Sequence, residues 1–404
     1  MLRSGLNLMV AQFLWLGASL FKGSCLIVLL AIASHQLTSI LLYLGINKRV
    51  YNHVPGSCSA VAGIDTGAVD IELIQATGLL FVSTGLRIYN HSFGPVDAEG
   101  AKKGGKGGGV KGNLYSYNVT SRTSWQLPIK SKTLTDTNLN PHGMGTWSVA
   151  ATKQSPERNF LYVINHRKRL DSVEVFRYGS RKAASGAKEP YLNHLRTVKS
   201  PLFYNLRDVA PVGEDRFYAT SQYYFRDPRL INLEDYMALR LGSVLFFDGA
   251  NASHAYRWIA SPAGLALDKS KKYLYVASSA GETIHVLSIG KDASLTYSSE
   301  IALSTSPYNI FVDPYTADLF VACQPIRMRF FRHQVTPKDV YSPTQVLKIK
   351  GRPSKAKWKV TEPYANDGAT ISGGTSAVLY KGSLLIGSLH DKMLACELEA
   401  QSLL

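Results

Sequence analysis

The chain has 404 residues, of which 45% are hydrophobic, so it can bury a full core and is not an intrinsically disordered protein. Its formal net charge is +16, with clusters of basic residues at positions 102–106 and 167–169. The basic residues form no stripe interleaved with aromatic side chains, so we expect no nucleic-acid partner. We interpret the charge as solvated surface, and the alternative is contact with an anionic membrane surface or an acidic partner.

Two apolar stretches separated by Lys22 occupy the N-terminus, and the second covers residues 25–46. About 20 apolar residues cross a bilayer, so this second stretch is long enough to do so. Residues 31–33 resemble a signal-peptidase site, but the sequence stays apolar well beyond them. We therefore predict a retained signal anchor over residues 1–50, followed by one domain over residues 51–404. The flanking charges do not decide its orientation.

Other features favour a secretory protein whose main domain is luminal or extracellular. Glycosylation acceptor motifs begin at Asn90, Asn118 and Asn251. Cys58 and Cys396 lie near the two ends of the domain, where a disulfide between them would close a ring-shaped fold, as an oxidising compartment permits. We expect the protein in the endoplasmic reticulum membrane or at the cell surface, attached to the membrane through its N-terminal helix.

A repeated pattern follows Cys58: a short apolar strand, a turn rich in Gly, Asp or Lys, and a second apolar strand. Six copies of the second strand are present, at residues 78–83, 160–165, 216–220, 273–278, 318–323 and 383–388. This repeat predicts an all-β fold, a six-bladed β-propeller behind the N-terminal hydrophobic helix. No convincing amphipathic helical run follows Cys58, although the segment from Tyr223 to Leu245 has the composition of a lid or a membrane-contacting helix, or of a packed core helix.

Several local motifs resemble those of the paraoxonase family, in the family's order. They lie at residues 63–67, 140–143, 163–166, 205–208, 217–220, 309–314 and 380–387. Members of that family are six-bladed propellers with an N-terminal hydrophobic helix, and they act as calcium-dependent lactonases and arylesterases. The resemblance implies a disulfide between Cys58 and Cys396 and a free thiol at Cys323, which we expect to be buried and inert.

The resemblance also implies a structural calcium ion in the central tunnel. Asp70 and Asp208 match the two aspartates that hold this ion in the family, and Met144 occupies the position of a backbone carbonyl ligand. Calcium takes six to eight oxygen ligands, so water would complete the shell. The alternative is that each aspartate caps a turn or pairs with a neighbouring arginine.

The family's second, catalytic calcium has lost most of its expected ligands in this chain. Val69, Arg207, Ala263 and Tyr308 stand where the family has carboxylate or amide side chains, and Asn309 is the one remaining ligand. Valine and alanine cannot coordinate calcium, and a guanidinium group repels it. We interpret Arg207 as a positive charge that replaces the metal without supplying its Lewis acidity.

His142 and His166 match the family's histidine pair, which is proposed to activate water as a general base. Their presence favours retained activity if they still act on water. The alternative is a vestigial pair that fills polar positions at the tunnel mouth. A general base alone contributes about 10²–10⁴-fold, too little for efficient ester hydrolysis.

Our leading hypothesis is a membrane-anchored, paraoxonase-like pseudoenzyme that binds a membrane-protein client. Some invertebrate members of the family act as chaperones or assembly factors for ion-channel subunits in the endoplasmic reticulum. The alternative is a calcium-dependent arylesterase or lactonase in which Asp65 or Glu72 supplies the missing ligands. A third possibility is a carrier of small molecules or lipids in the same tunnel.

Overall fold

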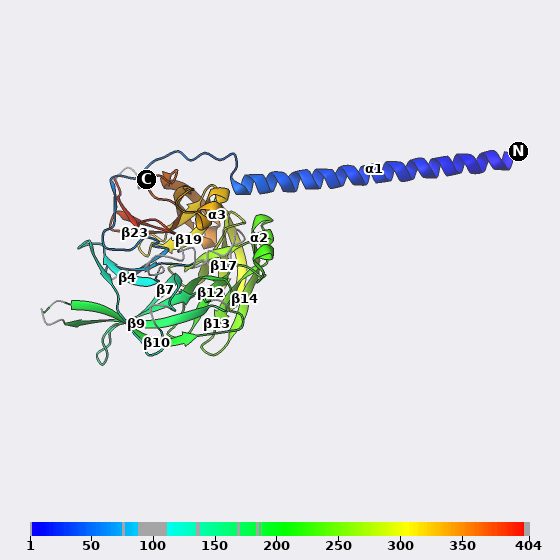
Figure 1. Ribbon diagram of the computed structural model, residues 1–404. Coiled ribbons are helices and arrows are strands. Elements are labelled where there is room, and N and C mark those ends of the chain that lie inside the picture. Colours follow the sequence, from blue (N-terminus) through cyan, green and yellow to red (C-terminus); the bar gives the residue numbers. More distant parts are fainter. Residues whose placement is uncertain are drawn as a thin grey trace, which may run out of the picture.

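The computed structural model describes residues 2–74, 77–87, 111–134, 138–167, 170–182, 186 and 188–399. The acceptor Asn90, the basic cluster at residues 102–106, and residues 168 and 169 lie outside the described residues. The described chain forms a β-propeller of six antiparallel blades, preceded by one long N-terminal helix (Figure 1).

The six blades follow one another along the chain. The first blade contains β2 (Asp70–Ile74), β3 (Leu79–Thr84), β4 (Asn113–Asn118) and β5 (Thr123–Gln126). The second contains β7 (Pro141–Val149), β8 (Arg158–Asn165), β9 (Ser172–Lys182) and β10 (Lys188–Val198), with β6 (Ile129–Lys130) added in parallel beside β10. The third contains β11 (Leu206–Pro211), β12 (Phe217–Ser221), β13 (Gly242–Phe247) and β14 (Ala252–Ile259).

The last three blades complete the circle. The fourth contains β15 (Pro262–Leu267), β16 (Tyr273–Ser278), β17 (Thr283–Ile289) and β18 (Leu295–Ala302). The fifth contains β19 (Ser306–Val312), β20 (Leu319–Gln324), β21 (Thr344–Arg352) and β22 (Lys357–Asn366). The sixth contains β23 (Gly374–Tyr380), β24 (Ser383–Ser388), β25 (Leu394–Glu397) and β1 (Cys58–Ala60). The first strand of each blade contacts the first strand of the next, and β23 contacts β2, which closes the ring.

The sequence repeat identifies the second strand of every blade. The six predicted segments correspond to β3, β8, β12, β16, β20 and β24. These strands are almost entirely buried because adjacent blades pack on both of their faces. Each of the six large core clusters joins two neighbouring blades, so no blade can bury its apolar surface alone. Cys323 lies in the cluster between the fourth and fifth blades, as a free and buried thiol.

The ring is closed covalently. β1 pairs with β25, and in that pairing Cys58 lies directly opposite Cys396, to which it is disulfide-bonded. The predicted bridge is therefore confirmed. It joins residues 338 positions apart in the sequence, and a disulfide stabilises most when it restricts a long loop in the unfolded chain, typically by about 2–4 kcal/mol.

The N-terminal apolar residues form one continuous helix, α1 (Leu2–Leu44), which projects away from the propeller (Figure 1). Within it, Trp15–Leu44 is long and apolar enough to cross a membrane, and most of its large side chains are exposed. This helix is a candidate membrane anchor or signal sequence, as predicted.

Two short helices, α2 (Pro228–Tyr236) and α3 (Arg327–Val335), lie beside the C-terminal end of α1 (Figure 1), and we call them the roof helices. α2 lies within the segment from Tyr223 to Leu245, for which the sequence suggested a lid or a helix. The expectation that no other helix follows Cys58 is wrong, because α3 is a helix. Its pattern is concealed because Arg327 and His333 occupy buried positions where an apolar residue is usual.

A buried polar cluster attaches α1 to the roof helices. The Arg327 guanidinium donates to both carboxylate oxygens of Asp235 at 3.2 Å and to the Tyr43 hydroxyl at 3.0 Å. The Tyr223 hydroxyl donates to Asp235 at 2.9 Å. Tyr43, Asp235 and Arg327 come from α1, α2 and α3, so the C-terminal end of α1 is held on the propeller through a desolvated ion pair.

Candidate functional site

Asp70 and Asp208 lie on the first strands of the first and third blades, where each binds backbone N–H groups. Asp70 accepts hydrogen bonds from Ile71 at 2.9 Å and from Met144 at 2.7 Å. Asp208 accepts from Val209 at 2.8 Å and from Leu265, in the next blade, at 2.9 Å. Both carboxylates are buried, and neither forms an ion pair within the described part of the chain.

Three carboxylates share this region. Burial raises the pKa of Asp70 to about 6, against the effect of its hydrogen bonds. Burial and the charge of Asp70 raise the pKa of Asp208 well above its usual value. Glu72, two residues after Asp70 on the same face of β2, has its pKa raised by burial and by the charges of both aspartates. Buried carboxylates with no basic partner favour a bound cation, although the described residues contain no group of three or more His, Cys, Asp or Glu side chains placed to hold a metal ion.

Met144 and Asn309 both contact Asp70. Met144 contacts Asp70 through its backbone N–H, which donates to the carboxylate, rather than through its carbonyl oxygen. The amide nitrogen of Asn309 donates to Asp70 at 2.6 Å. Asn309, expected as a remnant of the catalytic shell, is therefore hydrogen-bonded to the proposed structural site.

Arg207 and Tyr308 lie together at the positions of two missing ligands. Nη1 of Arg207 donates to the Tyr308 hydroxyl at 3.3 Å, and its Nε donates to the side-chain oxygen of Gln222. The other two replaced positions, Val69 and Ala263, are completely buried. The guanidinium group is thus fixed by two hydrogen bonds beside the histidine pair.

The two predicted histidines form one hydrogen-bonded chain with Tyr308. Nε2 of His142 lies 3.3 Å from the Tyr308 hydroxyl, and its Nδ1 lies 2.8 Å from Nε2 of His166. Nδ1 of His166 lies 2.9 Å from Asp171. Burial lowers the pKa of His142 well below its usual value, and the charges of Arg207 and His166 lower it further, so this imidazole is neutral.

The donors in this chain follow a single direction when the imidazoles are neutral. The Asp171 carboxylate accepts from Nδ1 of His166, so Nε2 of His166 accepts from Nδ1 of His142. Nε2 of His142 is then an acceptor and receives the hydroxyl proton of Tyr308, whose oxygen accepts from Arg207. In either direction, both ring nitrogens of His142 are hydrogen-bonded within the protein, so neither is free to accept a proton from water.

Asp171 was not identified from the sequence. It lies just before β9, five residues after His166, and also accepts from the N–H of Leu206 at 2.8 Å. A carboxylate five residues after a candidate general base is the sequence signal that could have identified Asp171.

An apolar cluster covers His142. The Tyr308 ring packs against Phe330 of α3 with 5.8 Å between ring centroids, and both belong to a cluster with Val69, Leu86 and Leu389. His142 is only 1% exposed. The imidazole is therefore shielded from solvent.

The acceptor motifs differ in exposure. Asn251 is exposed in the turn before β14. Asn118 ends β4, and its side-chain oxygen accepts from the N–H groups of Thr120 and Ser121 at 3.0 Å. Asn251 is therefore the more accessible of these two.

Comparisons with known proteins match the same part of the chain. A family model described as arylesterase matches residues 30–398. The chain is 32% identical over 343 residues to serum paraoxonase/arylesterase 2 of Bos taurus, covering 85% of this chain and 89% of that protein. It is 29% identical over 375 residues to mechanosensory abnormality protein 6 of Caenorhabditis elegans, covering 90% and 92%. A solved luciferin-regenerating enzyme aligns with a TM-score of 0.46 at 10% identity, over 85% of this chain and 95% of that one. The chain belongs to the paraoxonase and arylesterase family.

Proposed function

We propose that this protein is a membrane-anchored member of the family that has lost calcium-dependent hydrolysis and binds membrane-protein clients in the secretory pathway. The observation that carries the proposal is that both ring nitrogens of His142 are engaged within the protein, Nε2 by the Tyr308 hydroxyl at 3.3 Å and Nδ1 by His166 at 2.8 Å. A general base must accept a proton from water at a free ring nitrogen, and His142 has both of its ring nitrogens occupied.

Arg207 supports the same conclusion. A catalytic metal would polarise the ester carbonyl and stabilise the negative charge that develops on its oxygen. The guanidinium group is instead hydrogen-bonded to Gln222 and to Tyr308, which belongs to a buried apolar cluster. The positive charge of Arg207 is therefore engaged in hydrogen bonds within the protein. The buried side chains of Val69 and Ala263 offer no metal ligand.

A structural calcium ion is part of the proposal. Asp70 and Asp208 would hold it, with Glu72 close enough to add to its electrostatic stabilisation. Calcium at this position would neutralise carboxylates from the first and third blades and so stabilise the ring.

The proposed binding of membrane-protein clients is supported by features that lie away from the propeller axis. The chain has an exposed apolar helix docked on the propeller, a disulfide and an exposed acceptor motif at Asn251, which fit a luminal or extracellular domain attached to the endoplasmic reticulum or cell-surface membrane. One similar protein of Caenorhabditis elegans is named for a mechanosensory abnormality. Together with the resemblance to invertebrate family members that assemble ion channels, these features support a chaperone or assembly function.

The loss of hydrolysis is tested with the full chain purified in detergent, with phenyl acetate and a simple lactone as substrates, in calcium and in chelator. We expect the rate to equal the uncatalysed background in both conditions and to be unchanged by His142→Ala. Calcium-dependent turnover that His142→Ala abolishes would contradict the proposal.

Client binding is tested in cells that lack this protein, by the surface amount of a co-expressed ion-channel subunit. We expect the wild-type chain and His142→Ala to raise surface delivery equally, and a chain without α1 to fail. Delivery that needs His142 would indicate a catalytic role, and delivery unaffected by the wild-type chain would contradict the assembly function.

A further inference from the structure

A cleft lies along the outer edge of the second blade. β6 pairs with β10 only where Ile129 and Lys130 face Leu192 and Asn193. A cavity of about 900 Å³ is lined by residues 129–133 on one side and by residues 193–197 and Lys199 on the other. Beyond the two paired positions, the outer edge of β10 has no partner among the described strands. Such an edge presents backbone donors and acceptors that can pair with another strand.

The cleft is strongly basic. Among the described residues that line it there is no Asp or Glu, and four side chains are cationic: Lys130, Lys132, Arg196 and Lys199. Lys130 is held 3.6 Å over the ring of Tyr191, and Arg196 is held by an ion pair with Asp215. Lys132 and Lys199 are exposed and take part in none of the salt bridges formed within the described chain.

Glu174, a buried acidic residue beside the cleft, has its carboxylate hydrogen-bonded within the blade. Glu174 accepts from His194 at 3.0 Å, Thr197 at 2.5 Å and Arg167 at 2.9 Å, and also from Asn165 and Ser172. These bonds fix His194 and Thr197, which line the cleft. The floor of the cleft is therefore rigid, and Glu174 is not available to neutralise the lysines on its rim.

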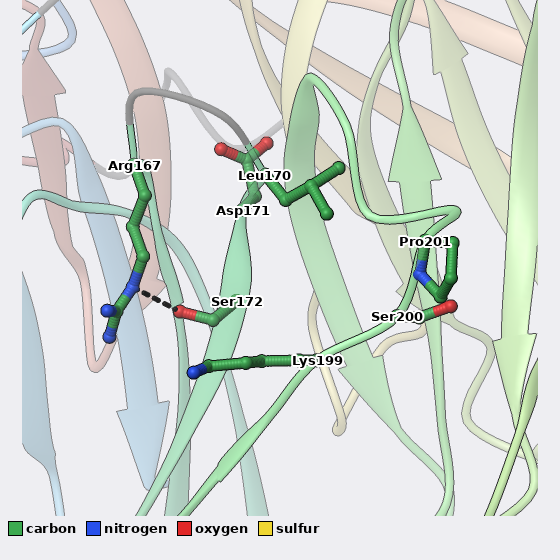
Figure 2. Close-up of a pocket in the computed structure, with 7 residues that line it drawn as sticks. All are labelled: Arg167, Leu170, Asp171, Ser172, Lys199, Ser200 and Pro201. Atoms are coloured by element: carbon green, nitrogen blue, oxygen red, sulfur yellow. Dashed lines mark hydrogen bonds between the residues drawn. The ribbon is translucent and has the colours of Figure 1, made fainter.

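A second, smaller cavity adjoins the cleft and is lined by Arg167, Asp171 and Lys199 among others. It has a volume of about 230 Å³ and shares Lys199 with the first (Figure 2). Figure 2 shows the charged ends of Arg167 and Lys199 on the same side of Ser172. Arg167 is already paired with Glu174, and Asp171 lines the same cavity, so of these two cations only Lys199 adds to the charge of the main cleft.

We propose that this basic cleft binds an acidic, extended peptide segment of a partner protein, which pairs with the free edge of β10. Side chains on one face of a strand repeat every two residues, about 6.8 Å apart, so alternating carboxylates can reach several rim cations while the backbone forms the ladder. β9 and β10 lie on the side of the propeller away from α1 (Figure 1), so a membrane that holds α1 does not reach the cleft. The inference is independent of whether the axis hydrolyses esters.

The probe is a fluorescein-labelled peptide of alternating Glu and Thr, about ten residues long, and the readout is fluorescence anisotropy with the full chain in detergent. We expect saturable binding that weakens with salt. Lys132→Glu combined with Lys199→Glu should weaken it by about tenfold or more. Lys291→Glu, in an exposed turn of the fourth blade, makes the same kind of change elsewhere and should have no effect. Equal binding by the Lys132 and Lys199 variant and the wild type would overturn the proposal.

Strand pairing is tested separately from charge. Two further peptides carry N-methyl groups on one or the other set of alternate residues, with all carboxylates retained. In an added strand only one set donates to β10, so one peptide should lose about tenfold in affinity and the other should not. Equal affinities of the two methylated peptides, or displacement by a sulfated oligosaccharide at equal concentration, would show that charge alone is recognised and would overturn strand addition.

Discussion

Arg207 and Tyr308, from the third and fifth blades, meet at the axis, where the guanidinium donates to the phenol oxygen at 3.3 Å. The phenol oxygen also lies 3.3 Å from Nε2 of His142, and the hydrogen bonds continue through His166 to Asp171. Within this series of hydrogen-bonded side chains, Tyr308, His142 and Asp171 are almost fully buried, whereas His166 and Arg207 are partly exposed. Loss of one link leaves a buried group unpaired, which is costly.

Tyr308→Phe should destabilise the protein, because it removes the donor to His142 and an acceptor for Arg207. The expected cost is about 1–3 kcal/mol, measured as a lower melting temperature of the full chain. Tyr315→Phe removes the hydroxyl of a tyrosine that is 74% exposed and should leave the melting temperature unchanged. Equal melting temperatures for Tyr308→Phe and the wild type would show that the chain of hydrogen bonds contributes nothing.

The metal-free protein should lose stability as the pH rises from about 4 to about 6. The pKa of Asp70 is raised from 3.8 to about 6 by burial, so the folded state favours the protonated carboxyl. That stabilisation is complete below the unfolded pKa and disappears as the pH passes through the folded value. It amounts to roughly 2–3 kcal/mol.

Calcium should reverse this trend at neutral pH, because a ligand that binds only the folded state stabilises it. Thermal melts across this pH range, with and without calcium, measure both effects. Asp70→Asn should flatten the pH dependence and abolish the response to calcium. Melting curves at pH 7 that chelation does not shift would exclude the structural ion.

The attachment of α1 to the roof helices should depend on the Arg327–Asp235 pair. Arg327→Met leaves the buried Asp235 unpaired and should cost about 3–5 kcal/mol, seen as a lower melting temperature. Arg329→Met, an exposed neighbour on the same helix, should cost far less. Adding Asp235→Leu to Arg327→Met should restore much of the loss, because both charges are then absent. A double variant as unstable as the single one would argue against the ion pair.

The disulfide should be needed to keep the ring closed. Cys58→Ser or Cys396→Ser should lower stability by about 2–5 kcal/mol, because the long unfolded loop is no longer restricted. Cys25→Ser, at an exposed position in α1, is the matched control and should be neutral. Denaturant unfolding of the full chain separates these cases, and a neutral Cys58→Ser would mean that the β1–β25 pairing suffices.

The propeller could be predicted because its signal is local and repeated. Each second strand, such as β20, is a short apolar run buried on both faces. α3 could not be predicted in the same way. Its buried Arg327 is neutralised by Asp235, which lies 92 positions earlier in the sequence, and only the folded structure brings them together.

The sequence grouped the candidate site residues but could not give the contacts between them. His142 and His166 were named as a pair, and they are hydrogen-bonded. The sequence pattern could not show that Asn309 binds Asp70 or that Tyr308 caps His142, because these contacts cross the ring between blades. The sequence suggested Glu72 only as a ligand of the second ion, whereas in the structure the charges of both aspartates help to raise its pKa.

The most direct test is anomalous scattering from crystals of the full chain grown in calcium. The account predicts one calcium peak, bound by Asp70 and Asp208, with the Arg207 guanidinium hydrogen-bonded to Tyr308 and no metal beside it. A second calcium peak next to Asn309, with the guanidinium turned away from Tyr308, would contradict it.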